Sequence, residues 1–415
     1  MTTVPAERSG FFFVLVADKC IRNFRFSLAL HCESRSFIFE LLPMLLGILR
    51  EPDHENRVSI TPDVVKQLVG KQVNITIETE AGLRASLTNE VYQEAGASVQ
   101  SRADVLAQAD IVVSIQPLTA ADTAKLKPGA ILFGMYQPLV NRERMAEIAA
   151  AKTTLFSMDA VPRITRAQAM DVLSSQSTVS GYKAVLLAAS HLPRFFPMLM
   201  TAAGTIAPAK VLIIGAGVAG LQAIATAKRL GAVVEAFDTR PSVKEQVESL
   251  GGKFVEVEGA VEDKAAGGYA VEQSEEFKRR QSEELAKRIV AADVVITTAL
   301  IPGKKAPVLI TEAMVRQMKA GAVIVDLASG AGGNCELTRE GETRNEFGVS
   351  IIPASNLPAT MPQDASKMYA KNMLNFLNLM ISKEGELKLN FEDEIIQGSC
   401  IAHGGEVVYP ALKQA

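Results

Sequence analysis

The sequence predicts an α/β protein built from two Rossmann-like domains with mostly parallel sheets. From residue 44 onward, short apolar runs alternate with segments of helical period, the pattern of parallel strands joined by covering helices. A glycine-rich turn with GxGxxG spacing follows the apolar run at 211–214. The chain has 415 residues, which is enough for two or three such cores.

Residues 1–43 do not share this pattern. The stretch is aromatic and lightly basic, and it has neither a helical nor a strand period. An apolar core near arginines is similar to a targeting segment, but acids such as Glu7 and Asp18 are untypical of a transit peptide. We interpret 1–43 as a poorly ordered or loosely packed extension ahead of a domain that begins at Met44.

The first domain is predicted from alternating strands and helices. Strands are expected at 45–49, 74–78, 111–115, 130–133 and 154–157, and helices from Pro62, at 89–95 and at 142–151. Thr61 is a suitable N-cap, and Pro62 is tolerated after it because the first helical N–H has no partner in any case. The alternation predicts a complete open α/β domain ahead of the glycine-rich turn.

Polar residues stand at helical spacing after the last of these strands. Thr165 and Gln168 have the spacing of a capping box, so a helix is expected to begin at Thr165. Gln168, Asp171 and Ser174 or Ser175 would then share one helical face, which can hold a flat amide such as a nicotinamide carboxamide. Alternatively, Gln168 serves the cap and Asp171 is a solvated acid of the first turn.

The glycine-rich turn predicts a dinucleotide site. Gly215 allows the tight turn, Gly217 lets backbone amides approach a pyrophosphate, and Gly220 lets helix and strand pack closely. The diphosphate is expected at the N-terminus of the following helix, where free amides and the helix dipole favour anions. The residues expected around it are Gly215, Ala216, Gly217, Val218 and Gly220.

The acid at the end of the next strand, 233–237, favours NAD over NADP. Asp238 is placed to accept hydrogen bonds from the adenosine ribose hydroxyls, and its charge would repel a 2′-phosphate. Thr239 and Arg240 follow. An arginine here can meet a 2′-phosphate; we prefer the alternative of a side chain solvated at the start of a loop, because Asp238 stands at the strand tip.

The remaining elements continue the alternation. A second helix at 181–195 is expected to link the domains, and a helix and a strand are expected within 243–257. Residues 260–277 have little to bury and predict a long mobile loop that includes Gly268 and Tyr269.

Two later strands, at 293–298 and 322–326, end in loops of small residues. Such loops lie at the carboxyl edge of a parallel sheet, where ligands bind in open α/β folds. Thr298, Ala299 and Leu300 stand at the first of these strand ends. The last helix is expected at 365–381, with a methionine-rich stripe that is typical of a core.

Composition excludes several classes of function. The formal net charge of −3 provides no electrostatic footprint for nucleic acid. The four cysteines have no CxxC spacing and the four histidines are scattered, so neither a metal site nor a disulfide framework is expected, and a reducing compartment fits. The nearest candidate for a membrane span, 195–209, is too short.

Several stretches carry a resemblance to a known family: ENRVSITPDVV, VPRITRAQAMDVLSSQ, GYKAV, TAAGTIAPAKVLIIGAGVAGLQAIATAKRLGA, FDTRPSVKEQVESLGGKF, GGYA, TTALIPGKKAPVLIT and DLASGAGGNCE. Together they resemble the NAD(H)-binding component, or domain I, of proton-translocating NAD(P) transhydrogenases, in the alanine dehydrogenase and transhydrogenase superfamily. The resemblance runs from about Met44 to the C-terminus.

The resemblance implies which residues form the site. NAD(H) would be the cofactor, with Tyr269 on a loop that closes over it. The nicotinamide would be surrounded by Arg163, Gln168, Asp171 and Ser174. This favours the site interpretation of the polar stretch over the capping interpretation.

The resemblance also implies a discontinuous first domain, at 44–170 and 345–415, with an NAD-binding domain at 171–344. The implied reaction is direct hydride transfer to or from NADP(H) on a partner domain, coupled to proton translocation by a transmembrane component. It needs two nicotinamide rings held face to face rather than a general acid. The chain would be a soluble, cytoplasmic, homodimeric subunit that reaches the inner membrane only through its partner.

Two alternatives remain open. Alanine dehydrogenases share the fold but use a lysine and a histidine on the keto acid. Here the corresponding stretches carry Ser114 and Gln116 in the lysine region and Gln137 in place of the histidine, so no proton-transfer group is expected there. The other alternative is a non-catalytic NAD-sensing module, which would bind NADH without transferring hydride.

Overall fold

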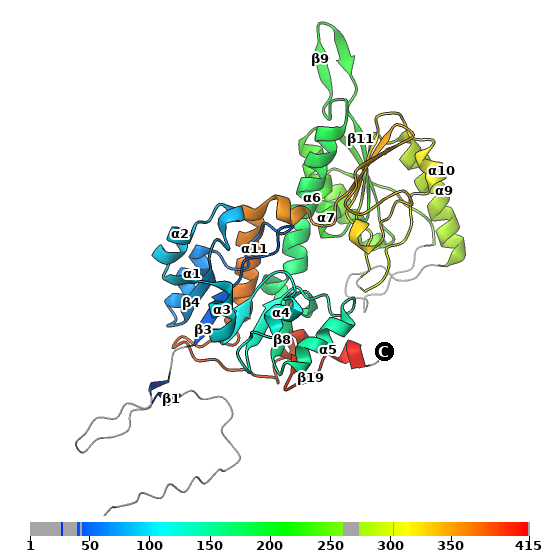
Figure 1. Cartoon of the computed structure of the whole chain (residues 1–415). Helices are drawn as coiled ribbons and strands as arrows, with labels where there is room; N and C mark the ends of the chain where they lie inside the picture. The colour runs from blue at the N-terminus through cyan, green and yellow to red at the C-terminus, as the bar shows by residue number, and fades with distance from the viewer. Residues whose placement is uncertain (1–25, 28–39, 42–43, 260–273, 302, 414–415) are drawn as a thin grey trace, which may run out of the picture. The chain divides into compact units, whose positions relative to one another are not determined.

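The computed structural model describes residues 26–27, 40–41, 44–259, 274–301 and 303–413 (Figure 1). The chain divides into two compact units, Met1–Pro43 and Met44–Ala415. In the smaller unit, β1 (Phe26–Ser27) pairs antiparallel with β2 (Glu40–Leu41). The rest of the predicted extension lies outside the described residues.

The first sheet of the larger unit has eight strands in the order β19-β18-β8-β7-β6-β3-β4-β5. They are β3 (Leu45–Ile48), β4 (Asn74–Glu78), β5 (Ala97–Gln100), β6 (Ile111–Val113), β7 (Ile131–Gly134), β8 (Thr154–Ser157), β18 (Cys400–His403) and β19 (Glu406–Val407). The strands from β3 to β8 are parallel and doubly wound, whereas β18 pairs antiparallel with β8. All five predicted strands are present; β5, β18 and β19 were not predicted.

Helices cover both faces of this sheet. They are α1 (Pro62–Val69), α2 (Asn89–Glu94), α3 (Arg102–Gln108), α4 (Ala120–Thr123), α5 (Arg142–Ala150) and α11 (Pro362–Leu377). Side chains that alternate along the strands share the core: Phe133 packs toward α1 and α11, and its neighbour Leu132 packs toward α3 and α5. Helix α11 carries the methionine-rich stripe, with Met373 and Met380 buried, and it lies among elements from the other end of the chain (Figure 1).

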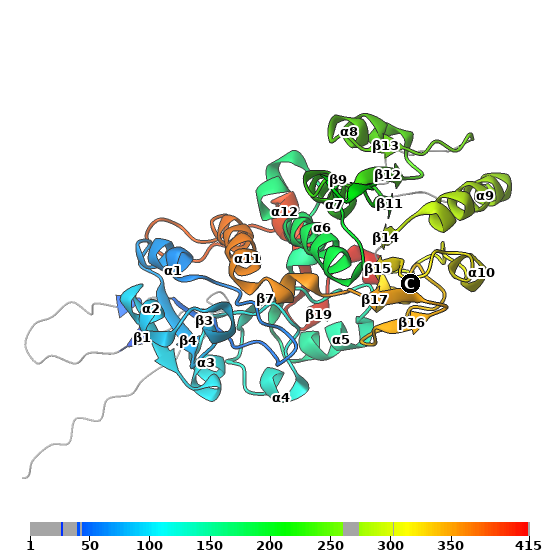
Figure 2. The same cartoon turned by 90° about the horizontal axis from the view of Figure 1, so that it is seen from above.

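The second sheet has seven strands in the order β13-β12-β11-β14-β15-β17-β16. They are β11 (Lys210–Ile214), β12 (Val233–Phe237), β13 (Lys253–Phe254), β14 (Val294–Thr297), β15 (Val323–Asp326), β16 (Arg344–Glu346) and β17 (Val349–Pro353). Helices α6 (Val172–His191), α7 (Val218–Arg229) and α8 (Lys244–Ser249) pack on one face, and α9 (Glu275–Ala291) and α10 (Glu312–Val315) on the other (Figure 2). The prediction of an α/β fold with mostly parallel sheets is confirmed.

The helix predicted at 181–195 does not exist as a separate element. Helix α6 runs without a break from Val172 to His191, and Gly181 lies in its middle. A Cβ at Gly181 would stand 2.1 Å from the Ala219 carbonyl oxygen of α7. The glycine therefore marks a close helix crossing rather than a helix boundary.

Three other boundaries differ from the prediction. Residues 345–353 belong to the second sheet, because β17 pairs with β15, so the return to the first sheet comes later than 345. Ser274 caps α9, so the end of the predicted loop at 260–277 is helical. The helix predicted to be last is followed by α12 (Glu394–Ser399) and α13 (Pro410–Lys413).

The apolar stretch at 195–209 forms a hairpin. Strand β9 (Leu199–Thr201) pairs antiparallel with β10 (Gly204–Ile206), and the hairpin stands away from the second sheet in Figure 1. Across the part of the chain that the structure describes, no helix combines the length and the hydropathy that a membrane span needs.

Candidate functional site

The glycine turn after β11 leaves an open helix N-terminus. Gly215 has a φ of +100°, and Gly220 lies so close to it that a Cβ there would be 1.9 Å from the Gly215 oxygen. Gly217 is the N-cap of α7, makes no side-chain cap bond, and would place a Cβ with nothing within 4 Å. The space beside Gly217 is therefore open at the N-terminus of α7, at the point where the strand order reverses, and this fits a diphosphate.

Asp238 and Arg240 form an ion pair beside this turn. Asp238 accepts a hydrogen bond from the Ala216 N–H at 2.7 Å, and the Arg240 guanidinium donates to both of its carboxylate oxygens at 2.9 and 2.8 Å. The two side chains are 6% and 15% exposed. The preferred interpretation of Arg240 as a solvated side chain is therefore wrong, because Asp238 holds the guanidinium against the turn.

The loop after β14 borders the same turn. Thr298 donates to the Gly215 carbonyl at 3.0 Å. Asn334 bonds to both backbone groups of Ala299, and its own N–H donates to Asp326. The sequence analysis named Thr298 and Ala299 but not Asp326 and Asn334, although an acid at a strand end ahead of a glycine loop was a visible signal. Leu300, which was also predicted, is exposed, whereas Gly268 and Tyr269 lie outside the described residues.

The polar stretch does not form the predicted single helix. Thr165–Met170 is a 3-10 turn without a side-chain cap bond, and the chain bends at Asp171 before α6 begins. Asp171 caps α6: its carboxylate accepts from the Ser174 N–H at 2.9 Å and from the Ser174 hydroxyl at 2.6 Å. Gln168 therefore precedes the bend, and the shared helical face predicted for it was wrong. Arg163 and Gln168 are exposed, and Asp171 and Ser174 are half-buried.

Helix α6 connects this polar stretch to the glycine turn. Gly181 of α6 crosses α7 at Ala219, in the first turn of the open helix N-terminus. Asp171 and Ser174 lie ten and seven residues before Gly181, which is roughly 10 to 15 Å along the helix axis. One rigid helix therefore spaces the two predicted parts of the site.

The carboxyl edge of the first sheet holds a buried acid that sequence reasoning missed. Glu51, in the loop after β3, is 4% exposed and accepts hydrogen bonds from the Ile115 and Gln116 N–H groups at 2.6 and 3.0 Å. Burial raises the pKa of Glu51 to about 7. This edge therefore holds a titratable acid next to Gln116, with both of its oxygens bonded to backbone N–H groups. No motif marked the position, because burial of a glutamate is a tertiary property.

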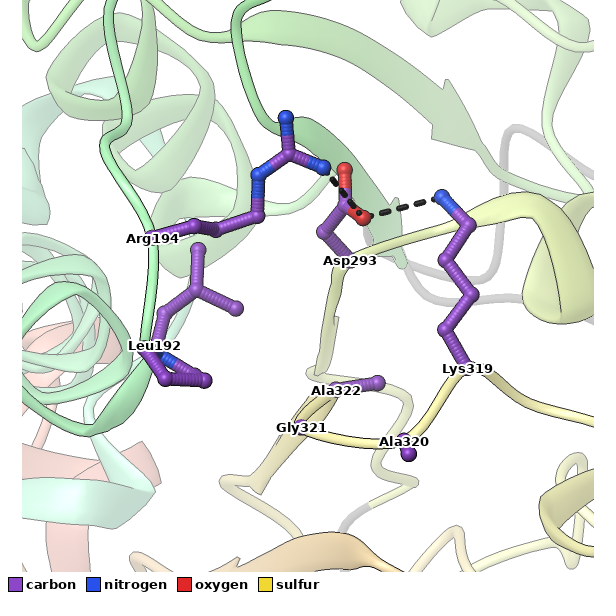
Figure 3. Close-up of a pocket in the computed structure, with 8 residues that line it drawn as sticks. Leu192, Arg194, Asp293, Lys319, Ala320, Gly321 and Ala322 are labelled. Atoms are coloured by element: carbon purple, nitrogen blue, oxygen red, sulfur yellow. Dashed lines mark hydrogen bonds and ion pairs between the residues drawn. The ribbon is translucent and has the colours of Figure 1, made fainter. Parts of the chain in front are cut away.

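A cavity of about 210 Å³ lies at the opposite, amino edge of the second sheet (Figure 3). Its lining includes Asp293, which binds both Arg194 and Lys319, at 3.0 and 2.9 Å, and accepts from the Lys210 N–H. These contacts tie Asp293 to three other segments, away from the glycine turn. Among the residues that the structure describes, no group of three or more His, Cys, Asp or Glu side chains is placed to hold a metal ion.

The sequence matches two family descriptions, "Alanine dehydrogenase/PNT, N-terminal domain" over 47–180 and "Alanine dehydrogenase/PNT, C-terminal domain" over 184–410. It is 50% identical over 367 residues to the first part of the NAD(P) transhydrogenase alpha subunit of Rhodospirillum rubrum, covering 86% of this chain and 96% of that protein.

Two further comparisons separate the members of this family. The crystal structure of transhydrogenase from Sinorhizobium meliloti is 42% identical with a TM-score of 0.81, covering 88% of this chain and 100% of that one. Alanine dehydrogenase of Bacillus subtilis is 28% identical, over 89% of this chain and 94% of that protein. The chain is therefore more similar to these transhydrogenase components than to this alanine dehydrogenase.

Proposed function

Because this chain belongs to the alanine dehydrogenase/PNT family and, within it, to the NAD(P) transhydrogenase alpha subunits, we propose that it binds NAD(H) and exchanges hydride with NADP(H) on a partner domain. The observation that carries this proposal is the open N-terminus of α7 at Gly217, directly beside Asp238. An anionic diphosphate fits the amides, and a ribose fits the carboxylate.

Bound NAD(H) supplies or accepts the hydride at its nicotinamide ring. Within the proposed site, the first-turn amides of α7 bind the diphosphate, and Asp238 orients the adenosine ribose. Arg163, Gln168, Asp171 and Ser174 orient the nicotinamide. The Ser174 hydroxyl donates to Asp171, so its oxygen keeps lone pairs that can accept a carboxamide N–H. Transfer needs no general acid, only aligned rings about 3–3.5 Å apart with water excluded.

The proposal includes further subunits. The name of the relative from Rhodospirillum rubrum describes it as one part of an alpha subunit, which supports a larger assembly. We propose an NADP(H)-binding domain and a transmembrane proton-channel component as partners, with this chain at the membrane surface only through them. A homodimer completes the proposal: Met198, Met200 and Ile206 of the hairpin are 57%, 75% and 42% exposed, and apolar side chains of this kind favour contact with a second surface.

The proposal is tested by following hydride transfer from NADH to an NADP analogue of distinct absorbance. The chain is assayed alone and then with an NADP(H)-binding transhydrogenase domain. We expect transfer only with the added domain, and we expect Gln168→Asn to abolish most of it while NADH still binds. Bound NADH without transfer in either assay would indicate a sensor instead. Pyruvate- and ammonia-dependent NADH oxidation by the chain alone would indicate an alanine-type dehydrogenase.

A further inference from the structure

Glu55 and Arg57 form a buried ion pair in the loop after β3. Their side chains are 0% and 4% exposed, and the guanidinium binds the carboxylate through Nε at 2.8 Å and Nη2 at 2.6 Å. Burial alone would raise the pKa of Glu55, but the hydrogen bonds and charge of Arg57 bring it below its ordinary value. Both groups are therefore charged and locked in one geometry.

The remaining hydrogen bonds of this pair reach three other segments. Arg57 Nη1 donates to Gln176 Oε1 of α6 at 2.7 Å, and Nη2 donates to Asn356 Oδ1 at 3.4 Å. Glu55 Oε2 accepts from Gln116 at 3.2 Å and from Asn356 at 3.3 Å. Asn356 lies on the segment that leaves β17 for α11. The pair therefore joins the first sheet both to α6 and to the chain that returns from the second sheet.

Gln176 is the residue through which this hydrogen-bond network holds α6. It is 5% exposed, and its amide also donates to the Ala365 carbonyl of α11 at 3.1 Å. Gln176 lies two residues after Ser174, about 200° around the helix axis. The face of α6 that bonds to Arg57 therefore lies nearly opposite Ser174. A helix is rigid over so few residues, and a fixed Gln176 therefore fixes where Asp171 and Ser174 stand.

The fact that the buried pair is charged also supports a role in positioning α6. A buried ion pair adds little net stability, since the cost of desolvating two charges offsets most of their attraction. Arg57 instead fixes the orientation of its partners, because the planar guanidinium donates at fixed angles to Glu55 and Gln176 at the same time. Such a device suits the alignment of a site better than the filling of a core.

We propose that Arg57, held by Glu55, is a positioning residue for the nicotinamide site: through Gln176 it sets the rotation and height of the first turns of α6, and so aligns Asp171 and Ser174. This inference rests on the proposed function. It predicts that loss of the hydrogen bond between Arg57 and Gln176 misaligns the nicotinamide ring, while the diphosphate and ribose contacts at the glycine turn stay intact.

The test compares four variants of the full-length chain. Gln176→Met removes both the acceptor for Arg57 and the donor to Ala365 at similar side-chain length. Gln176→Glu loses only the donor to Ala365 and turns the bond from Arg57 into an ion pair. Gln116→Met is the matched control, because it removes one bond to Glu55 without touching α6. Gln176→Asn, one methylene too short to reach Arg57, serves if the Met variant fails to fold.

The first readout uses no nucleotide. Hydrogen exchange of the peptide covering 171–180 should become about tenfold faster in Gln176→Met, mainly because the hydrogen bond to the charged Arg57 is lost. Gln176→Glu and Gln116→Met should stay within about twofold of the wild type. Unchanged exchange in the Met variant would overturn the proposal.

The second readout is hydride transfer with the NADP(H)-binding domain present. Gln176→Met should lower kcat about tenfold while the KM for NADH changes less than about twofold, because only ring alignment is lost. Gln176→Glu should restore most of kcat. A wild type that transfers hydride beside a fully active Met variant would refute the positioning role alone. If the wild-type chain transfers no hydride, the proposed function is refuted. The hydrogen-exchange data would then decide whether the bond from Arg57 holds α6 in place.

Discussion

At the scale of residues, Asp238 and Arg240 favour opposite cofactors. The carboxylate suits the ribose hydroxyls of NAD, and the guanidinium would suit the 2′-phosphate of NADP, but the two neutralise each other in an ion pair. Asp238→Ser removes this carboxylate partner of Arg240. We expect the ratio of NADPH to NADH affinity to rise by about tenfold or more, as expected for a newly paired phosphate. Fluorescence titration of both nucleotides measures this ratio.

The control for this prediction is the double variant Asp238→Ser with Arg240→Ala. It lacks both the repelling carboxylate and the guanidinium, so the gain for NADPH should disappear. If the single and double variants bind NADPH equally well, Arg240 does not face the 2′-phosphate position, and the repulsion by Asp238 alone accounts for NAD preference.

Glu51 gives a second prediction at this scale, on pH dependence. Its pKa is raised from 4.5 to about 7, so between these values the unfolded chain releases a proton that the folded chain keeps. The free energy of unfolding should therefore fall as pH rises through this window, by up to about 1.4 kcal/mol per pH unit, and the loss is complete above it. Glu51→Gln removes this dependence.

The measurement is the melting temperature of both proteins at pH 5, 6, 7 and 8. The wild type should lose stability relative to Glu51→Gln between pH 5 and 7 and run parallel to it above pH 7. The amide also changes the two backbone hydrogen bonds, which shifts the whole curve but not its slope. Parallel curves throughout would show that Glu51 titrates normally.

At the scale of elements, the crossing of α6 and α7 predicts opposite effects for two glycines. A Cβ at Gly181 would meet the Ala219 oxygen at 2.1 Å, whereas a Cβ at Gly217 would meet nothing. Alanine in a helix normally stabilises by about 1 kcal/mol relative to glycine, but Gly181→Ala should destabilise by about 1–3 kcal/mol because the helices must part. Gly217→Ala should leave the melting temperature unchanged and weaken NADH binding by about tenfold, since its methyl occupies the diphosphate cradle.

Calorimetry and NADH titration on both variants separate the two effects. A Gly217→Ala chain that binds NADH normally would mean that no diphosphate approaches the N-terminus of α7. A Gly181→Ala chain of wild-type stability would mean that the two helices can separate without loss.

The same elements show where sequence reasoning succeeded and where it could not. The glycine turn was predictable because its GxGxxG spacing lies between an apolar run and a helical segment within one short stretch of sequence. Gly220, for example, meets the oxygen of Gly215 only five residues away. Gly181 was misread because its reason, Ala219, is distant in the sequence. The capping-box spacing of Thr165 and Gln168 predicted a helix start six residues ahead of the cap that the structure shows at Asp171. The cap at Asp171 prevails in a helix whose next residues, Val172 and Gln176, are buried.

At the scale of the whole molecule, the six parallel strands of each sheet share one doubly wound order. Their parallel pairing was predictable from the alternation of strands and helices. What local patterns could not provide is how the two sheets are joined. The network of Glu55, Arg57, Gln176 and Asn356 draws on residues up to 301 positions apart. No spacing rule connects such positions, and their polar side chains read as ordinary loop and helix-surface residues until the fold buries them.

The last prediction concerns the division between Met1–Pro43 and Met44–Ala415. The two stretches form separate compact units, and the core of the larger unit begins in β3 with Leu46. A chain that begins at Met44 should therefore keep its melting temperature within about 2 °C of the full length and its NADH affinity within about twofold. The matched control begins at Gly47: it removes only three more residues, but these include half of β3, the strand that pairs with both β4 and β6, so this chain should not fold. A drop of about 5 °C or more on removing 1–43, equivalent to about 1–2 kcal/mol, would mean instead that the smaller unit contributes to the stability of the larger one.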